Sequence, residues 1–97
     1  MYGTIARLHP RPGKADELLS LGESMRQAPM TGYRSSWIFR PDQNPYFRDT
    51  LFLVAVFDDV DTYRSNADSP EQNARYQQLR SLLEDDPDWM DGTFLGG

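Results

Sequence analysis

The sequence predicts one α+β domain in which a four-stranded antiparallel sheet carries its helices on a single face. The first observation behind this prediction is the order of the segments, which is strand, helix, strand, strand, interrupted helix, strand, the split βαβ arrangement. The second is the segment 50–57, which is apolar without alternation, rich in β-branched and aromatic residues and too short to span a membrane. We therefore expect this segment to be a strand that is buried on both faces.

Length and composition limit the classes of protein to consider. The 97 residues suffice for one domain, covering residues 1–97, whose small size allows only about two-thirds of the unfolded chain's surface to be buried. With 15 acidic and 10 basic side chains the net charge is -5, which argues against nucleic acid or an anionic membrane as partner. Cysteine is absent, so neither disulfides nor a thiol nucleophile are available. We see no signal peptide and no transmembrane segment, and expect a soluble cytoplasmic protein.

The first half of the chain reads as strand, helix and strand. Residues 3–9 are predicted to form a strand that ends at the turn 10–13, because proline and glycine dominate that turn. In residues 15–25 the apolar side chains recur at helical spacing, and acidic residues near the start suit the positive end of a helix dipole. Residues 33–40 then alternate, with Tyr33, Ser35, Trp37 and Phe39 predicted to share one face.

The second half adds the remaining elements. The loop 41–49 is rich in turn formers and returns the chain to the strand 50–57, which we expect to be antiparallel to the preceding strand. Either of the two aspartates after that strand can cap a short helix. A second helix begins at 69–72, where serine, proline and glutamine form a capping-box pattern, and it ends at 85–87. Residues 89–95 are predicted to be the last strand.

This element order is the ferredoxin-like plan, in which both helical regions cover one face of the sheet. The other face would then be apolar, because alternate residues of the strand 50–57 point to opposite sides. One side would carry Leu51, Leu53, Ala55 and Phe57, and the other Phe52, Val54 and Val56. Two such sheets packed face to face would cover these side chains, so we expect a homodimer.

Several segments resemble a known family. They are Arg11-Pro12-Gly13-Lys14-Ala15-Asp16-Glu17-Leu18, Phe57-Asp58-Asp59, Asp61-Thr62-Tyr63-Arg64 and Ser69-Pro70. With the strands and helices around them, they resemble the antibiotic biosynthesis monooxygenase-like domains of the dimeric α/β barrel superfamily, over nearly the whole chain. The resemblance implies a dimeric α/β barrel; the superfamily includes cofactor-free oxygenases, haem-degrading enzymes and other activities.

The resemblance also implies a pocket between the helices and the sheet in each subunit. The implied catalytic residues are Arg7, His9 and Asn66, and the implied ligand-binding residues are Ser35, Trp37, Tyr63 and Tyr76. Each has a structural interpretation as well: His9 as a hydrogen-bonded residue at a strand end, Trp37 as core or interface packing, and Tyr63 as a core residue.

Cofactors and metals are not expected. Haem-degrading relatives carry a histidine in the second helical region, and residues 59–83 contain none. The acidic cluster around Asp86 fails the spacing of a calcium loop, because Met90 and Asp91 stand where an oxygen ligand and a glycine are required. The cluster is better explained as a solvated turn.

Two functions stay open. One is a homodimeric, cofactor-free monooxygenase acting on a small aromatic or polyketide-like ligand, with Arg7 or His9 stabilising an anion. The alternative is a non-catalytic dimer that binds a small hydrophobic ligand or serves as an interaction module, which the single histidine and the absent cysteine favour modestly. A water-poor cavity with polar groups pointing into it would favour the enzyme.

Overall fold

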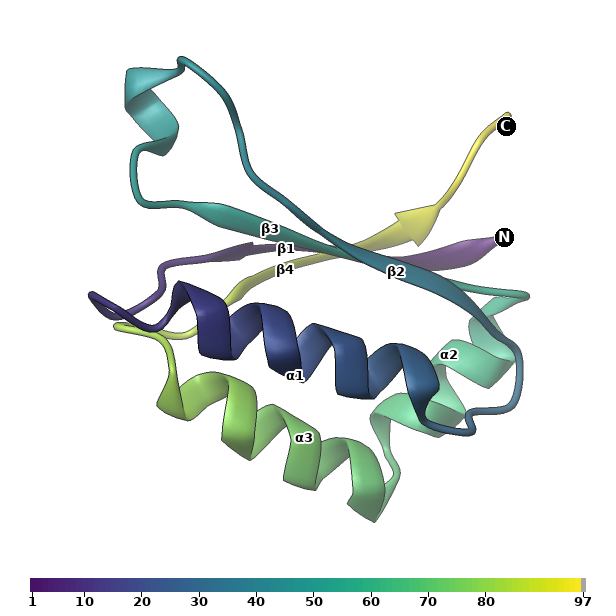
Figure 1. Ribbon diagram of the computed structural model, residues 1–97. Coiled ribbons are helices and arrows are strands. Elements are labelled where there is room, and N and C mark those ends of the chain that lie inside the picture. Colours follow the sequence, from purple (N-terminus) through teal and green to yellow (C-terminus); the bar gives the residue numbers. More distant parts are fainter. Residues whose placement is uncertain (97) are drawn as a thin grey trace.

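The computed structural model describes residues 1–96 and has the predicted α+β, ferredoxin-like architecture, with α1, α2 and α3 on one face of a four-stranded sheet (Figure 1). In chain order the elements are β1 (Tyr2–Leu8), α1 (Ala15–Gln27), β2 (Tyr33–Phe39), the 3-10 helix η1 (Pro45–Phe47), β3 (Leu51–Phe57), α2 (Val60–Ala67), α3 (Pro70–Ser81) and β4 (Asp88–Thr93). The predicted order of strands and helices is confirmed. Within residues 1–96 no helix has the length and apolar character needed to cross a membrane.

The sheet order is β2-β3-β1-β4, and every neighbouring pair is antiparallel. β1 and β3 occupy the centre, and their register places Ala6 opposite Leu53 and Leu8 opposite Leu51. All four side chains are buried, at no more than 4% exposure, under the helices. Since cross-strand neighbours point to the same face, this register fixes which residues of both strands face the helices.

The core lies between this sheet face and the helices. Leu18 of α1, Leu79 of α3 and Leu83 just after α3 are buried against the central strands. Leu8 and Leu83 are fully buried. The apolar stripes predicted for the two helical regions therefore pack where the sequence pattern placed them.

Side-chain caps define the start of the second helical region. Of the two aspartates after β3, Asp59 is the cap of α2, and its Oδ1 accepts a hydrogen bond from the Thr62 backbone N–H at 2.8 Å. This hydrogen bond is the main reason that the pKa of Asp59 is lowered. Ser69 caps α3 by accepting from the Gln72 backbone N–H at 3.1 Å.

The capping box at α3 is only half formed, so that part of the prediction is wrong. The Ser69 backbone N–H donates to the Asn66 carbonyl oxygen at 3.0 Å, and the Gln72 side chain is therefore not needed to satisfy it. Instead Gln72 Oε1 accepts from Asn66 Nδ2 at 3.3 Å. The break between α2 and α3 is thus linked by side chains from both helices.

The side of the sheet away from the helices is apolar, as predicted. We call it the open sheet face, and its large side chains are Ile5, Trp37, Phe39, Phe52, Val54 and Met90. Three of them are strongly exposed in the single chain: Trp37 at 54%, Phe39 at 58% and Met90 at 65%. On this face Phe52 and Val54 of β3 are half-buried, whereas Val56 is buried at 6% exposure, so β3 is incompletely covered over Phe52 and Val54.

The close contact between the central strands gives a test at Gly3. A Cβ atom there would lie 1.9 Å from the Ala55 carbonyl oxygen, whereas a Cβ at its cross-strand partner Gly92 would meet no atom within 4 Å. We expect Gly3→Ala to lower the free energy of unfolding by about 1–3 kcal/mol, since the strands must move apart. Gly92→Ala is the matched control and should change it by less than about 0.5 kcal/mol. Urea unfolding of both variants measures this, and equal stabilities would contradict it.

Candidate functional site

A cavity of about 430 Å³ lies between the sheet and the helices, and we call it the helix-side cavity. α2, α3, the end of α1 and the helix-facing side of the sheet all contribute to its walls. Its apolar lining includes Met25, Met30, Leu53, Phe57 and Leu79. Its polar lining includes Tyr63, Asn66, Gln72, Arg75, Tyr76 and Asp91. This mixture of a mostly apolar wall and a few polar groups is typical of a small-molecule site.

Tyr63 of α2 is fixed at the sheet side of the cavity. Its hydroxyl donates a hydrogen bond to Asp91 Oδ1 at 2.7 Å, and its ring meets those of Tyr2 and Phe57 edge-on at centroid distances of 5.4 and 5.6 Å. Burial, and then the hydrogen bond to Asp91, raise the pKa of Tyr63 to about 12. At neutral pH the phenol is therefore protonated, and Asp91 is its acceptor.

A polar network joins the two helices across their break. Gln72 Oε1 accepts hydrogen bonds from Asn66 Nδ2 at 3.3 Å and from Arg75 Nη1 at 3.1 Å. The same Nη1 lies 3.6 Å from the sulfur of Met30, in the segment after α1. One acceptor thus holds an amide and a guanidinium side by side on the helix wall of the cavity.

Tyr76 and Trp89 form an aromatic part of the wall. Their ring centroids are 6.4 Å apart with planes tilted by 45°. Trp89 faces the helices because it pairs with Ala6, a buried residue of β1. As Trp89 remains 44% exposed, this aromatic pair borders both the cavity and solvent.

Three of the seven residues predicted for the pocket, Tyr63, Asn66 and Tyr76, line the helix-side cavity together. The expectation that Arg7, Ser35 and Trp37 face the helices is wrong. Arg7 pairs with Phe52 and Trp37 with Val54, which places both on the open sheet face. Alternate residues of a strand point to opposite faces of the sheet, so an assignment that is wrong by one residue places every side chain on the wrong face. This is the error for Arg7 and Trp37.

An irregularity in β2 separates two residues predicted to share a face. The register shifts between Tyr33 and Ser35, so that Tyr33 pairs with Phe57 and Ser35 with Val56. Tyr33 lines the helix-side cavity, and Trp37 lies on the open sheet face. A bulge of this kind changes the direction of the side chains that follow it.

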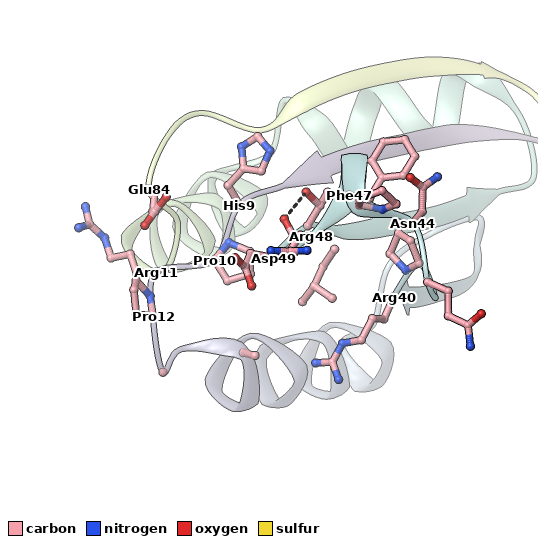
Figure 2. A pocket seen from close by; sticks show the side chains of 17 residues that line it. His9, Pro10, Arg11, Pro12, Arg40, Asn44, Phe47, Arg48, Asp49 and Glu84 are labelled. Carbon is pink, nitrogen blue, oxygen red and sulfur yellow. Dashed lines mark hydrogen bonds between the residues drawn. The ribbon is translucent and has the colours of Figure 1, made fainter.

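His9 lies outside the helix-side cavity, just after the end of β1, in a second hollow of about 960 Å³. Its Nδ1 is 2.9 Å from Asp85 Oδ1. Figure 2 shows His9, Arg11 and Arg40 at separate edges of this hollow. His9 is thus a hydrogen-bonded residue at a strand end, which is the structural one of its two interpretations.

Gln72, Arg75 and Asp91 also line the cavity and were not among the predicted pocket residues. Arg75 precedes the buried Leu79 by four residues, which places both on the same side of α3. An arginine on an apolar helix stripe was therefore the available signal. For the part of the chain from Met1 to Gly96, no three His, Asp or Glu side chains gather in a way that could hold a metal ion.

No family model matches the chain, and no curated protein matches it by sequence. Solved structures do match its fold. SnoaB, a cofactor-independent oxygenase from Streptomyces nogalater, superposes with a TM-score of 0.79 at 18% identity, over 99% of this chain and 94% of that chain. The chain has the fold of the antibiotic biosynthesis monooxygenases.

Two further solved structures with this fold also match nearly the whole chain. A candidate antibiotic biosynthesis monooxygenase from Deinococcus radiodurans gives a TM-score of 0.78 at 14% identity, over 100% of this chain and 95% of that chain. A candidate of the same kind from Chloroflexus aurantiacus gives 0.72 at 21% identity, over 99% and 94% of the two chains. At identities of 14%, 18% and 21%, these three matches show a fold shared over nearly the full length of the chain.

The Tyr63–Asp91 hydrogen bond has a measurable pH dependence. Because the folded pKa of about 12 lies above the ordinary 10.0, the folded chain binds this proton more tightly than the unfolded chain. The resulting stabilisation is complete below about pH 10 and is lost as the pH rises towards about 12. In a spectrophotometric tyrosine titration, Tyr63→Phe should remove the transition near pH 12, and Asp91→Ala should move it down. Titration of Tyr63 near 10 in the unaltered protein would contradict this.

Proposed function

We propose that the protein binds a small aromatic or polyketide-like ligand in the helix-side cavity and promotes its reaction with oxygen without a cofactor. The observation that carries the proposal is the convergence of Tyr63, Asn66 and Tyr76 on one mostly apolar cavity. The fold supports it, since SnoaB, with the same fold, is a cofactor-independent oxygenase. The proposal assigns no role in this cavity to Arg7, His9, Ser35 or Trp37.

The proposed chemistry begins with an acidic C–H or O–H group on the ligand. The ring lies against Tyr76, and Asn66 donates a hydrogen bond to the ligand's oxygen, which favours the anion and lowers the ligand's pKa. Asp91 is the carboxylate of the cavity wall; its Oδ1 accepts the Tyr63 hydrogen bond, and its second oxygen can accept the released proton. Apolar wall residues such as Leu53, Phe57 and Leu79 would reduce the number of water molecules around the anion.

The electron-rich anion is itself the reductant of oxygen. For a ligand with a CH₂ group activated by a neighbouring carbonyl, the carbanion adds O₂, and the resulting peroxide anion takes the proton back from Asp91 to give a hydroperoxide. Loss of water from the hydroperoxide converts the CH₂ group into a carbonyl. One oxygen atom enters the product and the other leaves as water with the two hydrogens, so the reaction is balanced without an added reductant.

Oxygen uptake tests this proposal. With a panel of quinols and anthrones we expect uptake above the spontaneous rate, and Asn66→Ala should lower the enzymatic rate about 10- to 100-fold because a donor to the developing anion is lost. Gln77→Ala, an exposed position on α3, is the matched control and should leave the rate unchanged. No uptake with any member of the panel would refute oxygenase function.

The alternative is a non-catalytic module that binds a small hydrophobic ligand. The internal hydrogen bonding of the cavity favours it, since Tyr63 and Asn66 already have partners in Asp91 and Gln72. Ligand binding without oxygen uptake would support this alternative, so calorimetry on the same panel separates the two functions.

We also propose that two copies pair through the open sheet face. Contiguous exposed apolar side chains mark interaction surfaces. Trp37 and Phe39 on one edge strand and Met90 on the other are exposed, and the half-buried Val54 and Ile5 connect them across the sheet. A second copy offers an identical apolar surface, which is what a two-fold symmetric interface requires. Pairing would cover the half of β3 that the helices leave exposed.

A charge on the open sheet face tests the pairing. We expect sedimentation to give a dimer at micromolar concentration, and Trp37→Glu to shift it to monomer because a carboxylate would be buried without a partner. Leu19→Glu is the control, since Leu19 is a comparably exposed apolar residue, at 42%, on α1. A monomer for the unaltered protein would overturn the proposed dimer.

A further inference from the structure

Among the described residues that line the helix-side cavity, Arg75 is the only cation. It is half-buried, and within residues 1–96 no carboxylate oxygen lies within 4.0 Å of its guanidinium. Its contacts are with the Gln72 amide oxygen and the Met30 sulfur. Arg7, Arg26, Arg34 and Arg80 each form an ion pair. The remaining arginines, which are Arg11, Arg40, Arg48 and Arg64, form none among residues 1–96 but are exposed to solvent, unlike Arg75.

The absence of a carboxylate beside Arg75 is notable in an acidic chain. The net charge is -5, so carboxylates are in excess over cations. The carboxylate that lines the same cavity, Asp91, accepts a hydrogen bond from Tyr63. The positive charge of a partly desolvated guanidinium is poorly stabilised when its partners are neutral, and an anionic group of a ligand would stabilise it.

The position of the guanidinium also suits a ligand. Gln72 Oε1 and Met30 both contact Nη1, which fixes the end of a long and otherwise mobile side chain at the cavity wall. Arginine has five N–H donors, and these two contacts involve a single nitrogen atom. The remaining nitrogens can therefore present the paired donors that a carboxylate accepts.

We propose that the helix-side cavity takes an aromatic acid, whose carboxylate binds Arg75 while its ring lies against the aromatic wall at Tyr76. Gln72 is a positioning residue, because it orients the guanidinium without touching the ligand's ring. Asp91 on the sheet wall disfavours a second acid group by repulsion, so the preferred ligand is a monocarboxylate. This inference rests on the proposed ligand-binding function of the cavity and adds the charge of the ligand to it.

Calorimetry with a matched pair of probes tests the inference. The probes are 2-naphthoate and its neutral isostere 2-naphthamide. In the unaltered protein we expect the acid to bind about ten-fold or more tightly than the amide, because a charge-assisted pair replaces a neutral hydrogen bond. Arg75→Gln should bring the ratio of the two affinities to about one and leave the affinity for the amide unchanged.

Further variants separate position from charge. Arg64→Gln removes the same charge from an exposed position on α2 and should keep the full ratio, which controls for the net charge of the chain. Arg75→Lys keeps the charge without the paired donors and should restore part of the ratio. Gln72→Ala should reduce the ratio with little effect on binding of the amide, a result that a purely structural role would not give.

The outcomes distinguish this inference from the function it rests on. Equal affinities for the two probes in the unaltered protein would overturn the role of Arg75 while the aromatic cavity stands. Binding of neither probe would overturn both the inference and the proposed ligand site. Because the comparison between probes is made first in the unaltered protein, it remains decisive if Arg75→Gln fails to fold by circular dichroism.

Discussion

The antiparallel pairing of β1 with β3 determines most of this structure. Its register sets Ala6 and Leu8 opposite Leu53 and Leu51, and these side chains can be buried only by helices on that side. The same register sends Ile5 and Phe52 to the other side, which α1, α2 and α3 do not cover; there the ring of Phe47 in η1 meets that of Phe52 at a centroid distance of 5.4 Å. The helix-side cavity and the open sheet face are therefore two consequences of one pairing.

The break in the second helical region gives the cavity its polar wall. A continuous helix from Val60 to Ser81 would run in one direction, whereas the caps at Asp59 and Ser69 start two shorter helices. α2 then contributes Tyr63 and Asn66, and α3 contributes Gln72, Arg75 and Tyr76. Ser69 satisfies its own backbone N–H through the Asn66 carbonyl, which leaves the Gln72 side chain available to Asn66 and Arg75. Local capping chemistry thus sets the arrangement of the candidate site.

Much of the fold was predictable from the sequence, because periodicity, caps and turn residues are local signals. The site was less predictable. In β1, Ile5 and Arg7 alternate with the small or apolar Thr4, Ala6 and Leu8, and the pattern alone does not say which set faces the helices. In β2 the bulge after Tyr33 separates it from Trp37, which no sequence rule signals here. Arg75 was harder to predict for a different reason, since scattered arginines are usually surface residues and its four-residue spacing from the buried Leu79 is the one sequence signal that separates it from them.

The two faces of the sheet carry separable properties. The open sheet face is apolar at its centre, with ionic contacts such as Arg7 to Asp88 at its margin, so its chemistry suits contact between protein surfaces. In the helix-side cavity, Asp91 accepts a hydrogen bond from Tyr63, whereas the guanidinium of Arg75 has no ionic partner among residues 1–96. The cavity therefore suits a ligand with one negative charge. Because an overall negative chain repels anions at long range, selection of such a ligand must come from this one local cation. A change on the open sheet face therefore acts on the cavity only through the backbone of β1 and β3 that the two faces share.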